Sequence, residues 1–287
     1  MLRARSISTV EEDGAVRATG THWAAGSSRR PSLADLRLVG RQLRYEQLAF
    51  WRNHFSAVFT VGFSVVFLLL LAAGGGTKRS SVIGGLEAIQ YYVPGFAAYG
   101  VMSASYNNLG IQLVVRREAG LLKRLRLSPI PTWVLFGAIF ANAAVISLLQ
   151  VALLLIIGRF GFALTLPRDY LALLVAVLVG VVCFCALGTA VSTLVPSQES
   201  AGPIISLIFF VLLFLSGLWF PLKPGSTLAR IANYFPIHHL ILAFFAPFDT
   251  ARGASPWAWH DLLVVGLWGL GAVALARRRF SFEPRRR

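Results

Sequence analysis

Three observations predict that this chain is an all-α polytopic membrane protein. Of its 287 residues, 56% are hydrophobic and only 14% are charged, compared with roughly 45–50% and 25% in an average soluble domain. Its apolar residues come in runs of about 20, the helical length that crosses a hydrocarbon core. Its Lys and Arg residues are concentrated in alternate connections between those runs. A soluble core cannot bury several such runs, and we therefore expect membrane helices.

The N-terminal region, residues 1–54, is polar and arginine-rich and has no apolar run of the secretory type. Residues 1–32 mix small, hydroxyl and charged side chains without periodicity, so we expect a disordered cytoplasmic arm. Residues 33–54 place apolar side chains on one side of a helical wheel, and four arginines form an adjacent arc: Arg37, Arg41, Arg44 and Arg52. This pattern indicates an amphipathic helix in the lipid headgroup layer, with a solvated helical arm as the alternative.

Six apolar runs are predicted to form a transmembrane domain over residues 55–276, followed by a basic cytoplasmic tail at 277–287. The spans lie near residues 55–73, 89–112, 132–157, 170–194, 201–220 and 261–276. The last run is short, but tryptophans at its edges, Trp257, Trp259 and Trp268, favour a span that ends in the interfacial layers.

The distribution of positive charge predicts the orientation of these spans. Twenty of the 27 cations lie in the N-terminal arm, in the connection between the second and third spans, and in the C-terminal tail. The positive-inside rule then places both termini in the cytoplasm, and the localisation we expect is the plasma membrane. A net charge of +15 would suggest a nucleic-acid partner in a soluble protein. Here orientation explains the charge, so we expect no such partner.

The second cytoplasmic connection carries a distinct pattern. Its first part is Arg116, Arg117, Glu118, Ala119, Gly120, Leu121, Leu122, Lys123 and Arg124, and two closely spaced prolines, Pro129 and Pro131, end it before the third span. We expect a short helix on the cytoplasmic surface, with leucines beside cations. The alternative is an ordinary loop that follows the positive-inside rule. Such a loop would explain the arginines, but it would not explain the leucines or the two prolines that end the segment.

The outer connection between the fifth and sixth spans contains five of the 13 prolines. Between two of them lies Ile237 to Ala246, an apolar stretch of ten residues that is too short to cross the membrane. We expect a re-entrant or interfacial helix entering from outside. The aromatic residues Trp219, Phe220, Tyr234 and Phe235 would mark the outer interface.

Isolated polar residues occur within the predicted spans. Asn107, Asn108, Asn142, Ser206 and Ser216 either form hydrogen bonds between helices or line a substrate path. We expect no catalytic residues and no metal, because no acidic cluster accompanies the adjacent pair His238 and His239. The sequence has no G-x-x-x-x-G-K-[ST] phosphate loop, so we expect no bound cofactor and an energy source on another polypeptide.

The order of these parts resembles the membrane subunit of type-2 ABC exporters, in the antibiotic-resistance (daunorubicin-resistance-like) or lipid-exporting branch of the ABC-2 type permeases. Three stretches carry the resemblance: Arg117-Glu118-Ala119-Gly120-Leu121-Leu122 through Leu127-Ser128-Pro129, Ser216-Gly217-Leu218-Trp219-Phe220-Pro221, and Ile231-Ala232-Asn233-Tyr234-Phe235-Pro236. The first is similar to an Arg-Glu-x-Gly motif before a proline stop, and the other two to the family's outer segment.

This resemblance implies a permease that dimerises, with itself or with a homologous permease, and docks on two cytoplasmic ATPase subunits that bind ATP and Mg²⁺. Residues 116–124 would form a coupling helix in a cleft of the ATPase, flanked by an elbow helix at 33–54. Substrate would move outward between the second and fifth spans of facing subunits. The resemblance also implies an outer gate formed by Trp219, Phe220, Tyr234, Phe235, His238 and His239.

The scarcity of charge within the spans, together with many Phe, Leu and Val residues, favours a hydrophobic or amphipathic cargo such as a drug, an antibiotic or a lipid. Two alternatives remain. One is a polysaccharide or glycolipid exporter of the same fold, and the other is a channel or membrane scaffold that needs no ATPase.

Overall fold

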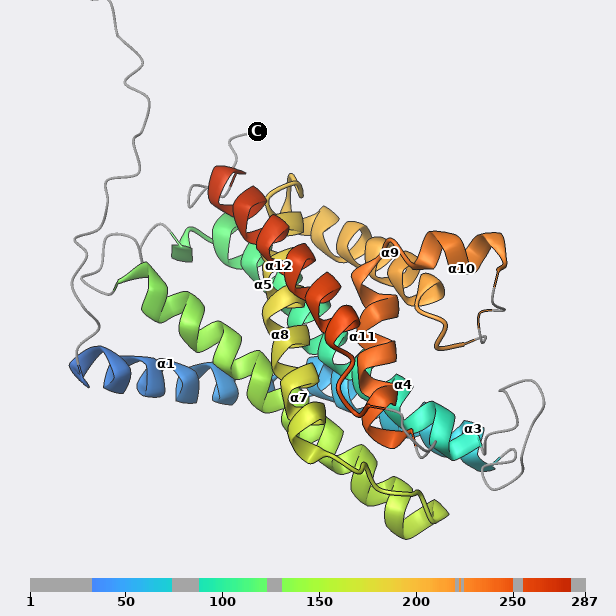
Figure 1. Ribbon diagram of the computed structural model, residues 1–287. Helices are drawn as coiled ribbons and strands as arrows, with labels where there is room; N and C mark the ends of the chain where they lie inside the picture. Colours follow the sequence, from blue (N-terminus) through green and yellow to red (C-terminus); the bar gives the residue numbers. More distant parts are fainter. Residues whose placement is uncertain are drawn as a thin grey trace, which may run out of the picture.

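The computed structural model describes residues 33–73, 88–122, 131–219, 222, 225–249 and 255–279, and all regular elements in these ranges are helices (Figure 1). The predicted disordered arm at 1–32 lies outside the described residues, as do Lys123, Arg124, Phe220 and the tail beyond Arg279.

The described elements follow one another along the chain as helices and helical turns. They are α1 (Leu33–Arg52), α2 (His54–Ala57), the π-helical turn η1 (Val58–Gly62), α3 (Phe63–Ala73), α4 (Ala88–Met102), the π-helical turn η3 (Ser103–Asn108), α5 (Leu109–Glu118), α7 (Thr132–Phe162), α8 (Tyr170–Ser192), α9 (Gln198–Leu215), α10 (Thr227–Ala232), α11 (Pro236–Phe245), the 3-10 turn η4 (Ala246–Phe248) and α12 (Trp259–Arg279).

Four helices are long and apolar enough to cross a membrane: Trp133–Phe162, Tyr170–Ser192, Gln198–Leu215 and Trp259–Arg279. They correspond to the third to sixth predicted spans. For the first predicted span, the apolar helical stretch is Val58–Leu71, which is shorter than a full crossing. The second corresponds to α4, η3 and α5, which follow one another without a break from Ala88 to Glu118.

The composition of the α4–η3–α5 stretch reflects its place in the bundle. Every residue from Val93 to Tyr106 is buried, because α3, α7, α8 and α11 all pack against α4. A helix surrounded by protein does not need lipophilic side chains on every face. Its buried residues accordingly include Gly, Ala, Ser and Tyr.

Small residues let the central helices approach closely, as is common between membrane helices. A Cβ added at Gly188 of α8 would lie 2.8 Å from the carbonyl oxygen of Tyr106 in η3. A Cβ added at Gly269 of α12 would lie 3.2 Å from Cα of Cys183 in α8. The alanines Ala186, Ala190, Ala272 and Ala276 continue the contact between α8 and α12. Helix α8 is thereby packed between η3 and α12.

Two ends of the bundle can be defined by their residues. The arginine end holds the last turn of α5, the end of α8 and the start of α9. Arg117 of α5 donates hydrogen bonds to the end of α8 and to the connection between α8 and α9. The histidine end holds the start of α4, the end of α9, helix α11 and the start of α12 (Figure 1). Tyr91 of α4 donates a hydrogen bond to the residue Gly217 just after α9. His239 of α11 meets Asp261 of α12.

Helix boundaries differ from the predicted ones at both ends of the bundle. Helix α7 continues to Phe162, past the predicted limit of 157, and ends where Ala163 adopts a left-handed conformation with φ 54°. Helix α9 ends at Leu215 and not at 220, because Ser216 accepts the backbone N–H of Leu218 and Gly217 has φ 85°. Capping and left-handed residues set these ends, and an apolar count does not detect them.

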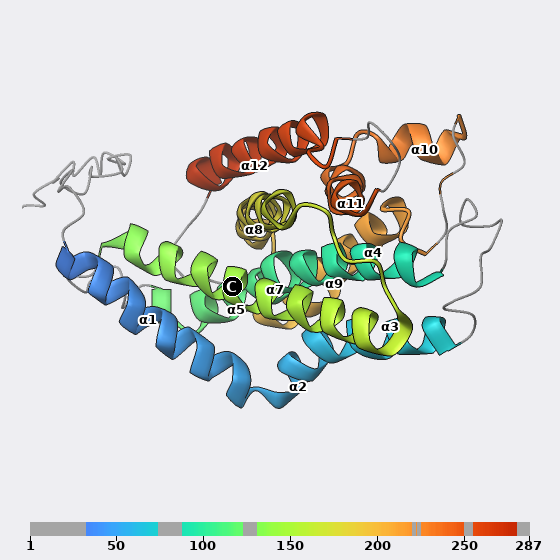
Figure 2. The same ribbon diagram turned by 60° about the horizontal axis from the view of Figure 1, so that its bottom comes forward.

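The predicted N-terminal helix and the predicted short outer helix are both present as helices. Helix α1 lies obliquely on the outside of the bundle against α7 (Figure 2). Helix α11, with Pro236 at its first turn, matches the stretch from Ile237 to Ala246 and packs against α4, α8 and α12. The positions of both relative to a bilayer are predictions.

Candidate functional site

The predicted second cytoplasmic connection begins as the last turn of a long helix. Helix α5 ends at Glu118, Ala119 is its C-cap, and the N–H of Gly120 donates to the carbonyl of Arg117. Gly120 has φ 70°, a left-handed conformation that favours glycine at this position. Leu121 and Leu122 then start a new helical segment. The predicted coupling helix is therefore divided by a turn, with Arg116, Arg117 and Glu118 before it.

Arg117 connects α5 to the end of α8. Its side chain is buried, 4% exposed, and its guanidinium donates to the carbonyl oxygens of Ser192 at 3.1 Å and Val195 at 2.7 Å. The same group forms an ion pair with Glu118 at 2.9 Å. The two carbonyls belong to the C-terminal end of α8 and the connection to α9, where a positive charge is favourable for the helix dipole.

Arg116 connects α5 to α1. It forms two hydrogen bonds with Glu46, at 2.9 and 2.6 Å, and a third with Gln112. Glu46 is buried in spite of its charge and also accepts a hydrogen bond from Gln42. We call Arg116, Arg117, Glu46 and Glu118 the arginine cluster. It joins α1, α5 and the α8–α9 connection immediately before Gly120.

The four arginines predicted for the elbow helix, Arg37, Arg41, Arg44 and Arg52, are all exposed on α1. The opposite side of α1 is attached to the bundle through Phe50, which is buried with Ile146 of α7 in a small cluster. This division between a cationic face and an attached face agrees with the predicted amphipathic pattern. The apolar side chains of Leu36 and Trp51 on α1 are exposed.

The two leucines after Gly120 differ in exposure. Leu122 is fully buried, whereas Leu121 is 45% exposed. A buried leucine supports the fold, while an exposed one at the end of a bundle is available to a partner. Of the predicted docking residues that the structure describes, Leu121 and the small Ala119 expose apolar side chains, and Leu121 is the larger of the two. Arg116 and Arg117 face the protein.

The predicted substrate-path residues do not form one continuous set. Ser206 of α9 donates to Asn107 of η3 at 3.3 Å, and Asn108 accepts from Gln112 at 2.9 Å. Asn142 lies on α7, where its carbonyl accepts from Gln47 of α1, and Ser216 forms part of the turn that ends α9. Only Asn107 and Ser206 are brought together across two helices, and these helices are the second and fifth predicted spans.

Further buried polar atoms lie on η3 and α7, and they include Asn142, which the sequence analysis singled out as a substrate-path candidate. The hydroxyl of Tyr106 and, on α7, Asn142 Oδ1, Ser147 Oγ and Gln150 Oε1 are buried without a hydrogen-bond partner among the described residues. Buried polar atoms of this kind are commonly met by water or a ligand. The sequence signal is the run Ser103-Ala104-Ser105-Tyr106-Asn107-Asn108, which is unusually polar for a buried helix, and π-helical turns are frequent at functional sites.

The predicted outer-gate residues separate into two groups. Trp219 packs edge-on against Phe67 and Phe96, on the side of α3 and α4. Tyr234 and Phe235 lie beside α12. The indole N–H of Trp268 donates a hydrogen bond to the backbone carbonyl of Tyr234, and the indole ring of Trp268 stacks on the ring of Phe235. The described aromatic residues therefore mark the histidine end without forming a single constriction.

The two adjacent histidines have different environments. His238 Nδ1 lies 3.3 Å from the carbonyl oxygen of Ser216, and burial lowers the pKa of His238 although that carbonyl acts in the opposite direction. His239 faces away and meets Asp261 and His260 at the start of α12. The sequence analysis considered only the adjacent pair and did not place His239 with the adjacent residues His260 and Asp261.

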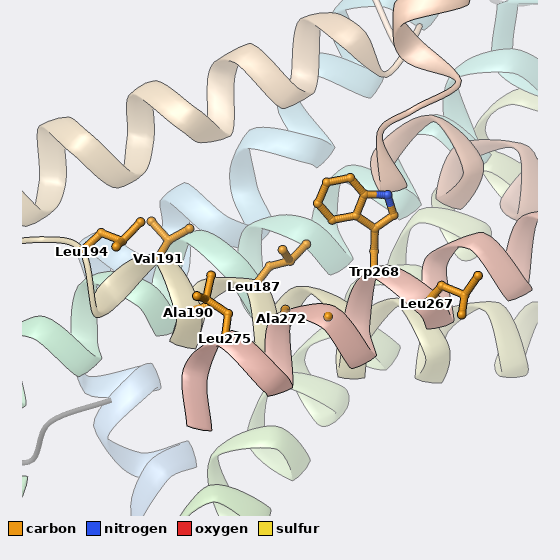
Figure 3. A pocket seen from close by; sticks show the side chains of 9 residues that line it. Leu187, Ala190, Val191, Leu194, Leu267, Trp268, Ala272 and Leu275 are labelled. Atoms are coloured by element: carbon orange, nitrogen blue, oxygen red, sulfur yellow. The ribbon is translucent and has the colours of Figure 1, made fainter. Parts of the chain in front are cut away.

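An apolar groove of about 420 Å³ lies between α8 and α12 (Figure 3). It is lined by Leu187, Ala190, Val191, Leu194, Leu267, Trp268, Gly271, Ala272 and Leu275. The only polar atom in this set of side chains is the Trp268 indole nitrogen, which is engaged with Tyr234. Such a surface suits an acyl chain.

These helices and ends define a multi-pass helical membrane protein. Residues 76–277 match the model of the ABC-2 family transporter proteins, and the chain belongs to this family. It is also similar to the "Putative transport permease YvfS" of Bacillus subtilis (strain 168), with 25% identity over 177 residues, which cover 61% of this chain and 70% of the relative. The predicted class, a membrane transport permease of the ABC-2 type, is confirmed at the level of the family.

Proposed function

We propose that this chain is the permease subunit of an ATP-driven exporter in the plasma membrane, and that its ATPase acts on it through the arginine cluster. The observation that carries the proposal is the position of this cluster. Arg116 and Arg117 tie the end of α5 to α1 and to the α8–α9 connection, and the exposed Leu121 follows within four residues. A force on Leu121 would be transmitted through these ties to three elements at once.

The membrane arrangement in this proposal has six crossings, with both termini in the cytoplasm. Successive helices run in alternate directions between the two ends of the bundle: α3, α4–η3–α5, α7, α8, α9 and α12 (Figures 1 and 2). The arginine end is the cytoplasmic one, in agreement with the basic residues Arg277, Arg278 and Arg279 at the end of α12.

The partners in this proposal are two cytoplasmic ATPase subunits, which bind ATP and Mg²⁺, and a second permease, either another copy or a homologue. The substrate path runs between the facing α4–η3–α5 and α9 helices. The Asn107–Ser206 contact joins these two helices. The exposed apolar stripe of α9, Leu207, Phe210, Val211 and Phe214, faces lipid or the second permease. A path with few charges favours a hydrophobic or amphipathic cargo such as a drug, an antibiotic or a lipid.

The test is purification of the chain from its native membranes in mild detergent, followed by identification of co-purifying proteins. We expect an ATP-binding subunit with a phosphate loop, whose ATPase activity is stimulated by the permease. Leu121→Ala should abolish the stimulation while leaving folding intact, because this side chain is exposed. Leu194→Ala, also exposed and at the same end on the α8–α9 connection, is the matched control and should retain it.

Repeated absence of an ATP-binding subunit would contradict the proposal and favour a channel or scaffold. Stimulation that survives Leu121→Ala would contradict the docking role of this segment.

A further inference from the structure

His239 on α11 has both ring nitrogens against hydrogen-bond acceptors. Nε2 lies 2.9 Å from the backbone carbonyl oxygen of Asn233, and Nδ1 lies 2.7 Å from a carboxylate oxygen of Asp261. A carbonyl can only accept, so Nε2 carries the hydrogen. Nδ1 of the neutral ring then presents a lone pair to a carboxylate that also presents a lone pair. A cation must lie between the two atoms, either a second proton or a metal ion.

His260 supplies a third ligand to the same point. Its Nδ1 lies 3.7 Å from the Asp261 oxygen that faces His239, and the ligand atoms of His239, His260 and Asp261 all lie within 4.8 Å of one another. Two imidazoles and one carboxylate, with a fourth position left for water, are the ligands of open zinc sites. The hydrogen bond from Nε2 of His239 to a carbonyl is the contact that orients a metal-binding imidazole.

We propose that His239, His260 and Asp261 bind a divalent transition metal ion of the Zn²⁺ class, which fastens α11 to the start of α12. Zn²⁺ with nitrogen and oxygen ligands at about 2.0–2.2 Å in tetrahedral geometry separates the ligand atoms by about 3.3 Å. The contact between Nδ1 of His239 and Asp261 widens slightly on binding, and His260 moves closer.

The burial of the three residues suits this role. His239 is 5% exposed, whereas the side chains of Asp261 and His260 are 18% and 82% exposed. The buried ligand is preformed, and the exposed one is free to rotate onto the ion and leaves a route for its entry. The nearby His238 is turned toward Ser216 and takes no part.

The experiment titrates purified full-length protein, isolated through a tag without histidine, with Zn²⁺ by calorimetry and with Co²⁺ by visible absorption. We expect one ion per chain, a tetrahedral Co²⁺ spectrum that Zn²⁺ abolishes, and a rise in the thermal midpoint that a chelator reverses. His260→Gln changes an exposed side chain and should weaken binding at least tenfold without loss of folding. His54→Gln, another exposed histidine at the start of α2, is the control and should bind as the wild type does.

Absence of binding by the wild type, or equal affinity in His260→Gln, would overturn the proposal. In that case a proton alone bridges His239 and Asp261. Since the readouts are binding and thermal stability, they do not depend on whether the chain exports a substrate.

Discussion

At the scale of single residues, Arg117 has the most demanding environment of the arginine cluster. A buried guanidinium is costly unless its donors are satisfied. Here it bonds to Glu118 and to two carbonyls more than 70 residues away in the chain. A helix C-terminus has several carbonyls without intrahelical partners. Arg117 therefore supplies a hydrogen-bond donor to a carbonyl at the end of α8.

Replacement of this group tests its structural role. Arg117→Met keeps much of the side-chain length but removes every donor, and it leaves Glu118 without its cation. We expect a loss of about 3 kcal/mol of stability, measured as a lower unfolding midpoint in detergent. Arg41→Gln on the exposed face of α1 is the control and should leave the midpoint unchanged. An equal midpoint for Arg117→Met would show that the contacts to α8 contribute no stability.

At the scale of elements, the attachment of α1 depends on the pair between Arg116 and Glu46. The bond is bidentate, and the side chains are 20% and 6% exposed, so solvent weakens it less than a surface pair. In a double-mutant cycle with Glu46→Gln and Arg116→Gln, we expect a coupling energy of about 1–2 kcal/mol. The stability of all four proteins is measured in one detergent. Additive effects of the two single changes would mean that α1 is held by Phe50 and its neighbours alone.

The close contact between α8 and η3 also belongs to this scale. In Gly188→Ala the new methyl group meets the Tyr106 backbone, at 2.8 Å from O and 3.2 Å from Cα, and a backbone cannot move aside as a side chain can. We expect a loss of about 1–3 kcal/mol, read from the thermal midpoint. In the matched variant Gly266→Ala on α12, the added Cβ meets nothing within 4 Å, so the midpoint should be unchanged or higher. A Gly188→Ala protein as stable as wild type would contradict the contact.

At the scale of the whole molecule, the proposed orientation assigns the histidine end to the outside. Ser255 lies before α12 at that end, and Gln198 begins α9 at the arginine end; both are exposed. A membrane-impermeant maleimide added to intact cells should label Ser255→Cys, and should label Gln198→Cys only after permeabilisation. The native Cys183 and Cys185 are buried in α8 and provide little background. The reverse pattern would place both termini outside and contradict the positive-inside interpretation.

Much of the helical framework could be predicted because its signals are local. The apolar runs of α7, α8, α9 and α12 and the proline that begins α11 are visible in consecutive residues. The helix over the second predicted span is also present, as α4, η3 and α5, although most of α4 and η3 is buried; its crossing of a membrane stays a prediction. Helices α7 and α9 end at Phe162 and Leu215, which differ from the limits of the predicted spans. Ala163 and Gly217 end these helices through backbone conformation and not through a change in hydropathy.

The candidate sites were predicted less completely, since their residues meet across long stretches of chain. The sequence indicated that residues near 116–124 matter, but it did not indicate that Arg116 faces Glu46 or that Arg117 faces Ser192. Nor did it associate His239 with Asp261. Such pairs depend on the rotation of each helix about its axis and on the small residues that set the distance between helices.

The sequence by itself thus determined that the chain is helical and membrane-embedded, and it indicated the family. Each of these follows from the length of apolar runs, the positions of prolines and arginines, and short motifs. Only the tertiary structure decided which polar residues meet: an arginine cluster at one end of the bundle and a His-His-Asp group at the other. It also showed buried polar atoms on η3 and α7 that have no partner among the described residues. The physical reason is that hydropathy is a property of consecutive residues, while a site is a property of side chains brought together by packing.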